Sequence, residues 1–260
     1  ELSNASHLNL DNPFIHTDFQ QPIQGMECPW GTVQFAFIYN PDKISNPPLN
    51  REELLEFVQK NPEKFTLDKS FTGLTLLKMW LIDISGNPDE LYGPFDEEKY
   101  NRYSQLLWEY LSQLRPYLWR KGTSFPDGPA TMHQMFATGE LWMTMSNNHF
   151  ERENKIALGV FPENTQSYVP NYGSIKNSHY VGIPFNAPNP EGAKLVADFL
   201  ISPEAQQKKS DPSVWGDGTV LKPEILGNSK HPFEEKALME LAPEYMIRLA
   251  EDFNRFIAEQ

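Results

Sequence analysis

Two widely separated strand-plus-helix units constrain the fold of this chain more than any other feature. The first unit is an apolar run, Thr32–Asn40, followed by a helix that we expect near residues 51–60. The second unit is a strand at Tyr180–Pro184, followed by a helix at Gly192–Leu200. In the first run both faces of the strand are apolar, which is typical of a strand buried between helices in an α/β sheet. The repeated alternation of strands and helices therefore predicts an α/β fold.

Helix-terminal residues support this interpretation. Asn50 is an N-cap residue with Glu53 in the capping-box position, Gly86 closes the helix that precedes it in the chain (72–84), and Pro116 kinks or stops the long helix 96–119. Ser202 precedes Pro203 at the start of another helix. The expected helices are 51–60, 72–84, 96–119, 128–138, 192–200, 203–208 and two within 234–259 interrupted at Pro243; the expected strands are 33–40, 140–146, 155–160 and 180–184, with a loop at 162–178.

Composition excludes several classes of protein. The chain has 260 residues, 39% of them hydrophobic, which is enough for one large domain or two modest lobes. A formal net charge of −13 disfavours nucleic acid as a partner. The single cysteine, Cys28, rules out an intrachain disulfide, and its surroundings favour a structural role. No apolar run is long enough to span a membrane, and the first residues lack a signal-peptide pattern, as expected for a mature or trimmed product.

Several ordered segments together resemble the ABC-importer substrate-binding proteins of the extracellular solute-binding family 1 type. The most specific segment is Asn189–Ala193 together with Phe199–Gln206, which is similar to the family's return crossover and the helices that follow it. Cys28–Gly31 is similar to the YnjB-like subgroup of that family. The other matching segments are Gln34–Asn40, Ser70–Gly73, Met135–Asn148 and Val169–Ile175.

The resemblance implies a two-lobe, type II periplasmic-binding-protein fold. Lobe one would comprise residues 1–36 and 179–206 with the hinge strands, and lobe two residues 37–178, whereas the helical segment 207–260 is not assigned to a lobe. Family members place more chain before the first hinge strand than this sequence does. We therefore expect lobe one to be incomplete here, with its first strands supplied by a separate N-terminal fragment.

The function that the resemblance implies is solute capture. Such a receptor closes two lobes over a small molecule and delivers it to the ABC permease subunits in the membrane, without a cofactor and without a covalent step. It would be periplasmic or extracellular and would reach the membrane only through a partner or a lipid anchor. The acidic charge and the aromatic candidates favour a cation, such as a polyamine or a thiamine-like compound, while sugars and anions stay open.

The residues expected to contact the solute follow from the same resemblance. Trp30 is either a contact or core filling, Tyr172 a stacking ring or a plain loop residue, and Trp215 a contact or part of a turn. The three polar residues Ser146–Asn148 end a strand, where ligands commonly bind in α/β folds. The candidates are Trp30, Gly31, Phe71, Thr72, Ser146, Asn147, Asn148, Tyr172, Gly173, Ser174 and Trp215.

Metal binding and catalysis receive less support from the sequence. The six histidines are scattered without metal-ligand spacing, and we expect no metal; His149, next to Asn148, is the one that could matter. Neither a nucleophile-elbow pattern nor a glycine-rich phosphate loop is present. A carbohydrate-active or other hydrolytic enzyme with an α/β fold remains the alternative, because a pair of catalytic carboxylates is visible only in space. A sugar- or peptide-binding module unconnected with transport is a third interpretation.

Overall fold

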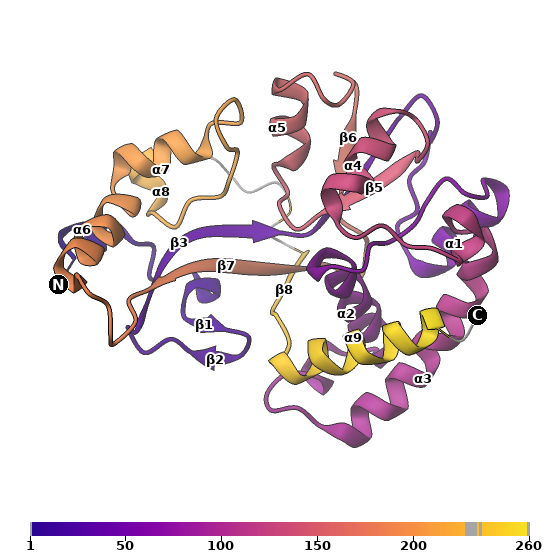
Figure 1. Ribbon diagram of the computed structural model, residues 1–260, viewed down its shortest axis with the longest axis horizontal. Helices are drawn as coiled ribbons and strands as arrows, with labels where there is room; N and C mark the ends of the chain where they lie inside the picture. Colours follow the sequence, from indigo (N-terminus) through magenta and orange to yellow (C-terminus); the bar gives the residue numbers. More distant parts are fainter. Residues whose placement is uncertain (1, 227–232, 234–235, 259–260) are drawn as a thin grey trace.

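The computed structural model describes residues 2–226, 233 and 236–258, and these residues form two halves of unequal size (Figure 1). The helices are α1 (Arg51–Lys60), α2 (Phe71–Ser85), α3 (Glu97–Leu114), α4 (Pro129–Ala137), α5 (Glu151–Ala157), α6 (Pro190–Leu200), α7 (Pro203–Ser210), α8 (Pro223–Leu226) and α9 (Pro243–Ala258), with 3-10 turns that include η1 (Ser3–His7) and η2 (Pro13–Ile15). The strands are β1 (Thr17–Asp18), β2 (Gln21–Pro22), β3 (Glu27–Gln34), β4 (Ala36–Tyr39), β5 (Met143–Ser146), β6 (Gln166–Tyr168), β7 (Ser174–Gly182) and β8 (Ala237–Leu238).

Two long strands lie side by side where the halves join. β3 pairs antiparallel with β7, from Glu27 opposite Gly182 to Gln34 opposite Lys176. The chain then passes Phe35 and enters β4, which belongs to a different sheet with the strand order β5-β4-β6. Both segments therefore run from one half to the other, and Figure 1 shows them crossing the middle of the molecule. Two adjacent crossings are the geometry of a hinge.

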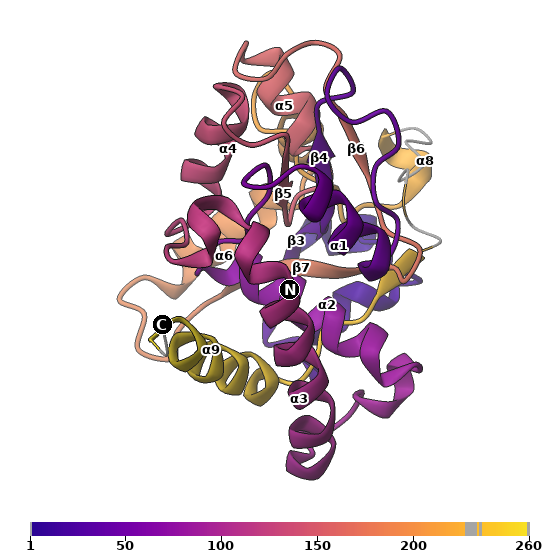
Figure 2. The same cartoon turned by 90° about the vertical axis from the view of Figure 1, so that its right-hand side faces the viewer.

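The larger half contains β4 to β6, α1 to α5 and α9. Its core is aromatic and aliphatic, and α2 lies at its centre because Leu76, Leu77, Met79 and Trp80 are all fully buried. The C-terminal helix α9 packs on α2, and Figure 2 shows it beside α3. This contact places the last helix of the unassigned segment 207–260 in the larger half.

The smaller half is built on β3 and β7 with η1, η2, the hairpin β1–β2 and helices α6 to α8. Its hydrophobic cluster is small and is centred on Leu8, Ile15, Ile201, Val220 and Leu221. Many of its apolar side chains are exposed instead.

Local signals in the sequence predict the well-formed helices correctly. The side chain of Asn50 accepts a hydrogen bond from the Glu53 backbone N at 2.8 Å, so the N-cap is confirmed; the Glu53 carboxylate accepts from Leu49 N and Asn50 Nδ2 rather than from Asn50 N. Gly86 ends α2 at φ = 76°, a conformation that glycine adopts without strain.

Three local predictions are wrong. Residues 155–160 are not a strand: α5 runs from Glu151 to Ala157, because a short apolar run fits either structure and the acidic first turn decides for a helix. The expected loop 162–178 contains β6 and the start of β7. The expected first tail helix before Pro243 contains β8, which gains backbone partners in β7 that sequence periodicity does not reveal; residues 234 and 235 lie outside the described residues.

Within the described part of the chain, no helix is both long and apolar enough to cross a membrane.

Candidate functional site

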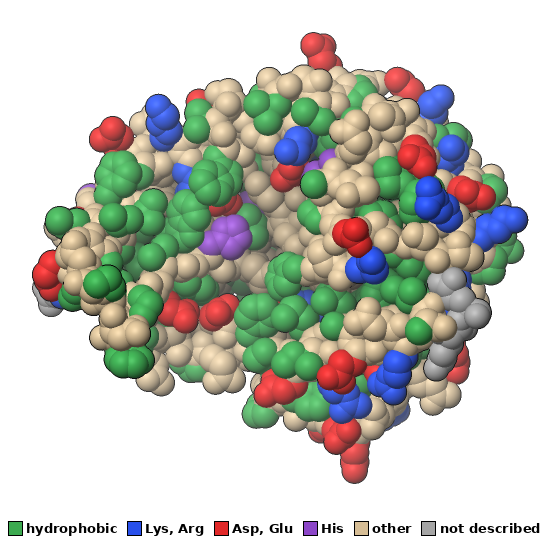
Figure 3. Space-filling view, in the orientation of Figure 1, with side chains coloured by type: hydrophobic (Ala, Val, Ile, Leu, Met, Phe, Trp, Pro, Cys, Tyr) green, Lys and Arg blue, Asp and Glu red, His purple; other side chains and the backbone are tan. Residues whose placement is uncertain are grey.

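A turn at residues 211–217 connects the two halves beside the hinge strand β3, where Gly218 pairs with Thr32. It belongs to the smaller half, yet Asn148 Nδ2 donates to Gly216 O at 2.7 Å and Asn154 Nδ2 donates to Pro212 O at 2.8 Å. Both asparagines lie in the larger half, in the loop after β5 and in α5. Figure 3 shows a hollow between the halves, bordered by hydrophobic side chains and a histidine. The residues at this junction form the candidate site.

Three aromatic rings line the smaller half near this turn. The rings of Trp30 and Trp215 meet edge to face with centroids 5.3 Å apart, and the His179 ring lies 6.3 Å from Trp30. More than half of Trp215 is exposed to solvent. An exposed tryptophan offers an apolar face on which a flat or cationic molecule can stack.

A buried ion pair supports these rings. Lys209 Nζ lies 3.1 Å from Asp217 Oδ2, and the two side chains are only 5% and 1% exposed. Burial lowers the pKa of Lys209, and the charge of Asp217 opposes that shift. The ammonium also lies 5.0 Å from the Trp30 ring centroid, and His179 Nδ1 lies 3.8 Å from Asp217 Oδ2. Because the ion pair carries no net charge, a solute would contact this side of the site mainly through the aromatic rings.

The opposite wall is the N-terminal end of α2. Ser70 is its N-cap residue, with Oγ accepting from Thr72 N at 3.3 Å, and Phe71 is exposed. Asn147 Nδ2 donates to Thr72 Oγ1 at 3.0 Å, which ties the loop after β5 to this helix end. Asn147 Oδ1 is buried and has no hydrogen-bond partner among the described residues.

The structure brings most of the predicted contacts together. Trp30, Gly31 and Trp215 lie on one wall, and Phe71 and Thr72 on the other. Ser146, Asn147 and Asn148 form the loop between them, where Ser146 Oγ accepts a hydrogen bond from Asn148 N at 3.0 Å.

Three predicted residues lie behind this region, in the hinge and the core. Tyr172 packs against the large core, its hydroxyl accepts a hydrogen bond from Trp80 Nε1 at 3.1 Å, and burial raises its pKa. Ser174 Oγ accepts from Gln34 Nε2 at 2.9 Å at the junction of β3 and β7. Gly173 is in the left-handed region at φ = 86°, and an added Cβ would lie 2.8 Å from Lys236 O. Their surroundings favour a structural role.

Sequence reasoning missed His179, Lys209 and Asp217. Asp217 lies two residues after Trp215 in the same turn, and this proximity was the signal in the sequence that could have pointed to it. His149 is buried, and its Nδ1 accepts a hydrogen bond from Gln34 N at 3.2 Å, which links the loop after β5 to the hinge. Among the described residues, no group of three His, Cys, Asp or Glu side chains is arranged to hold a metal ion.

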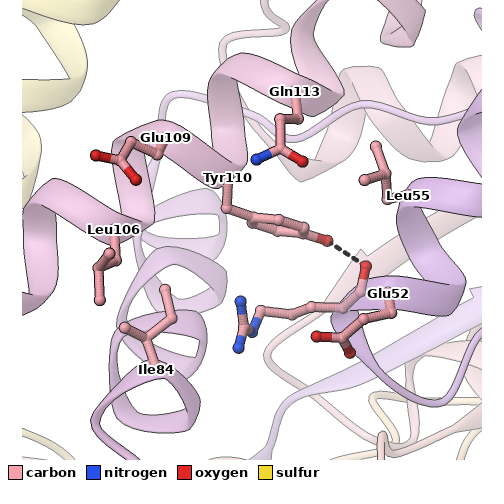
Figure 4. A pocket seen from close by; sticks show the side chains of 8 residues that line it. Glu52, Leu55, Ile84, Leu106, Glu109, Tyr110 and Gln113 are labelled. Carbon is pink, nitrogen blue, oxygen red and sulfur yellow. Dashed lines mark hydrogen bonds between the residues drawn. The ribbon is translucent and has the colours of Figure 1, made fainter.

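A separate cavity of about 350 Å³ lies on the outside of the larger half (Figure 4). The side chains that line it come from α1, α2 and α3. There the Tyr110 hydroxyl donates to Arg51 O at 2.8 Å, and the Arg51 guanidinium lies over the Tyr110 ring. None of its lining residues belongs to the candidate site.

The two crossings and the walls contributed by both halves define a two-lobe binding protein of type II. The chain belongs to the family of bacterial extracellular solute-binding proteins, whose pattern matches residues 15–229. This match confirms the resemblance inferred from the sequence.

A related protein and two solved structures illustrate the similarity. Protein YnjB of Escherichia coli (strain K12) is 41% identical over 227 residues, which are 86% of this chain and 58% of YnjB. PotD from Streptococcus pneumoniae, a spermidine/putrescine ABC transporter substrate-binding protein, is 13% identical, with a TM-score of 0.68 over 98% of this chain and 75% of PotD. Iron-bound HitA from Pseudomonas aeruginosa is 17% identical, with a TM-score of 0.64 over 97% of this chain and 74% of HitA. The fold is therefore shared by proteins whose solutes differ.

Proposed function

We propose that this chain is the solute-binding receptor of an ABC importer and that it delivers a captured small molecule to the membrane permease. The observation that carries this proposal is that the two halves meet at one junction, where the side chains of Asn148 and Asn154 donate to backbone carbonyls of the turn at 211–217. A solute held there would contact both halves and favour their closed arrangement.

In this proposal the smaller half acts as lobe one, with residues 1–36 and 179–206 together with the turn at 211–217, and the larger half acts as lobe two, with residues 37–178 together with α9. The proposed contacts are Trp30, Trp215 and His179 on one lobe and Phe71, Thr72 and Asn147 on the other. Capture needs only non-covalent contacts, and we propose no catalytic step. Consistent with the extracellular family, we place the receptor in the periplasm or outside the cell, held at the membrane by its permease or by a lipid anchor.

The test is a thermal-shift screen against polyamines, thiamine-like cations, sugars and anions, followed by isothermal titration. A ligand present at about 100 times its dissociation constant raises the free energy of unfolding by about 2.7 kcal/mol. A receptor gives heat that saturates, whereas an enzyme gives heat that continues. Continuing heat with a turned-over compound would favour the hydrolytic alternative and contradict this proposal.

Asn147→Ala and Trp215→Ala should each weaken binding of the solute found in the screen. Asn147 offers an amide oxygen without a donor, and Trp215 offers a ring face. Loss of an aromatic contact corresponds to about a two- to tenfold weaker affinity. The matched control is Asn164→Ala, an exposed asparagine elsewhere in the larger half. Unchanged affinity in the two test variants would remove both residues from the site.

We also propose that a separate N-terminal polypeptide completes lobe one on its apolar face. The support is a cavity of about 940 Å³ whose walls come from η1, the start of β3, the end of β7 and α6. Beside it, Met26 is 80% and Leu195 74% exposed, and Figure 3 shows hydrophobic side chains gathered over this half. Exposed apolar patches of this kind usually mark a surface that another polypeptide covers.

Intact-mass analysis and light scattering of the purified protein test this partner. We expect a second peptide, or self-association that Leu195→Glu and Phe199→Glu reduce, because both side chains are exposed on α6. A stable monomer with no second peptide would contradict the proposed fragment. It would leave the proposed solute site unaffected.

A further inference from the structure

We propose that the hairpin β1–β2 is a latch that holds the two halves together. Its base is bonded to the smaller half, and its tip contacts the larger half. This connection is additional to the two hinge strands, one of which (β7) anchors its base, and to the turn at 211–217. Its effect on solute affinity rests on the proposed function, but its effect on the arrangement of the two halves does not.

The base of the hairpin is fixed to β7 in the smaller half. Tyr180 Oη donates to Thr17 O at 2.8 Å and to Phe14 O at 3.1 Å, and Ser178 Oγ donates to Phe14 O at 2.5 Å. These bonds attach both the hairpin and the preceding turn η2 to one strand. The hairpin therefore moves with the smaller half.

The tip of the hairpin reaches the larger half through Phe19 and Gln20. Gln20 Nε2 donates to Glu240 O at 2.5 Å, and Gly93 N donates to Gln20 Oε1 at 3.4 Å. The Phe19 ring meets the Phe71 ring edge to face at 6.2 Å. One amide thus binds two separate loops of the larger half, and one ring packs on the start of α2.

A buried ammonium lies under this contact. Lys78 of α2 is fully buried, and its Nζ lies 2.7 Å from Glu240 Oε2. The same Nζ lies 5.4 Å from the Phe19 ring centroid and 4.9 Å from that of Phe71, so one ring from each half faces it. Cation–π attraction is strongest where water is excluded, as it is here. Separating the halves would remove the Phe19 ring from this ammonium.

The backbone of the tip indicates the same role. Thr17 pairs with Pro22 and Asp18 with Gln21, which leaves a two-residue turn. Phe19 and Gln20 both have positive φ, 44° and 67°, in a turn type that normally uses Asn and Gly. Such strain persists where surrounding contacts over-determine it. The contacts to the larger half supply that constraint.

The latch bears on the candidate site because Phe71 and Thr72 begin the helix that forms one wall. A link that favours the closed arrangement raises the fraction of molecules competent to hold a solute. Loss of the Phe19 contact should therefore weaken the affinity for a solute by about two- to tenfold.

The experiment measures the distance between the halves by double electron–electron resonance without any solute. Spin labels are placed at Lys60→Cys in α1 and Lys194→Cys in α6, both exposed, in a Cys28→Ser background of the full chain. The parent should give one narrow distance distribution. Phe19→Ala with Gln20→Ala should broaden that distribution and shift its mean.

Matched controls are Phe185→Ala and Gln24→Ala, which change an exposed phenylalanine and an exposed glutamine with positive φ in the smaller half. Both should leave the distribution unchanged. A latch variant that matches the parent would overturn the proposal. If the double variant fails to fold, Gln20→Ala alone is measured and judged by the same criterion.

The outcomes separate the two proposals. If the latch variant leaves the distance unchanged while a solute still binds, the latch is wrong and the receptor stands. If the distance changes and no solute is found in the screen, the latch stands by itself.

Discussion

Gly31 lies where a buried ion pair comes closest to the backbone of β3. A Cβ at this position would be 2.6 Å from Asp217 Oδ2 and 2.9 Å from Lys209 Nζ. Neither side chain can easily move away from an added Cβ, because both are buried and Gly218 N also donates to Asp217 Oδ1 at 2.9 Å. A glycine is therefore required here for close approach, and its function is to let the pair support Trp30.

At this scale we predict that Asp217→Ala lowers the free energy of unfolding by about 3–5 kcal/mol, because Lys209 is left buried without its partner. The double variant Lys209→Met with Asp217→Asn should lose much less, since no unpaired charge remains. Urea unfolding followed by circular dichroism measures both changes.

The matched control is Glu56→Ala, which removes the partner of Lys60 in an exposed pair on α1. Its expected loss is about 0.5 kcal/mol or less. An equal loss in the single and double variants at the buried pair would contradict the explanation.

Among the helices, some ends are set by residues nearby in the chain and others by contacts with the rest of the molecule. α1 begins where Asn50 predicts, because the side chains of Asn50 and Glu53 accept hydrogen bonds from backbone donors within the same segment. α5 does not follow its apolar pattern. Asn154, in its middle, is buried because it donates to Pro212 O in the other half.

For the elements we predict that Asn50→Ala lowers the free energy of unfolding by about 1 kcal/mol, because the N-cap bond to Glu53 N is lost. Asn50→Asp should retain most of the stability, since a carboxylate accepts the same bond. Thermal unfolding of the parent and the two variants measures the order of their stabilities. Equal losses for Ala and Asp would show that the cap is not the cause.

At the scale of the whole molecule, buried tyrosines connect stability to pH. Burial raises the pKa of Tyr100, Tyr110, Tyr168 and Tyr172 above its usual value in the larger half, and that of Tyr180 to about 12 in the smaller half. The folded protein therefore keeps these phenolic protons at pH values where the unfolded chain has lost them. The stabilisation that results is complete below pH 10 and is lost as the pH rises toward the folded-state values.

We predict that the urea midpoint falls steadily from pH 10 to about pH 12, because the unfolded chain loses phenolic protons that these five side chains keep in the folded protein. Tyr180→Phe should reduce this dependence, because one of the shifted groups is removed. A midpoint independent of pH in this range would contradict the assignment.

The sequence alone determines the family, the α/β fold class and the helices whose ends are capped locally. Helix ends depend on residues that are close together in the chain, and the family is visible as a set of similar segments that follow one another in the same order. It also proposed Trp30, Trp215 and the loop Ser146–Asn148 as solute contacts, but only the structure shows that they lie at one junction.

Only the tertiary structure decided which polar residues meet across that junction. The pairing of Lys209 with Asp217, the bond from Asn148 to Gly216 and the contact of Gln20 with Glu240 join parts of the chain that pass through different elements. The same holds for Tyr172 and Ser174, which resemble ligand residues in sequence but lie within the core and hinge. Such contacts depend on the relative placement of two halves, and no local pattern of residues encodes that placement.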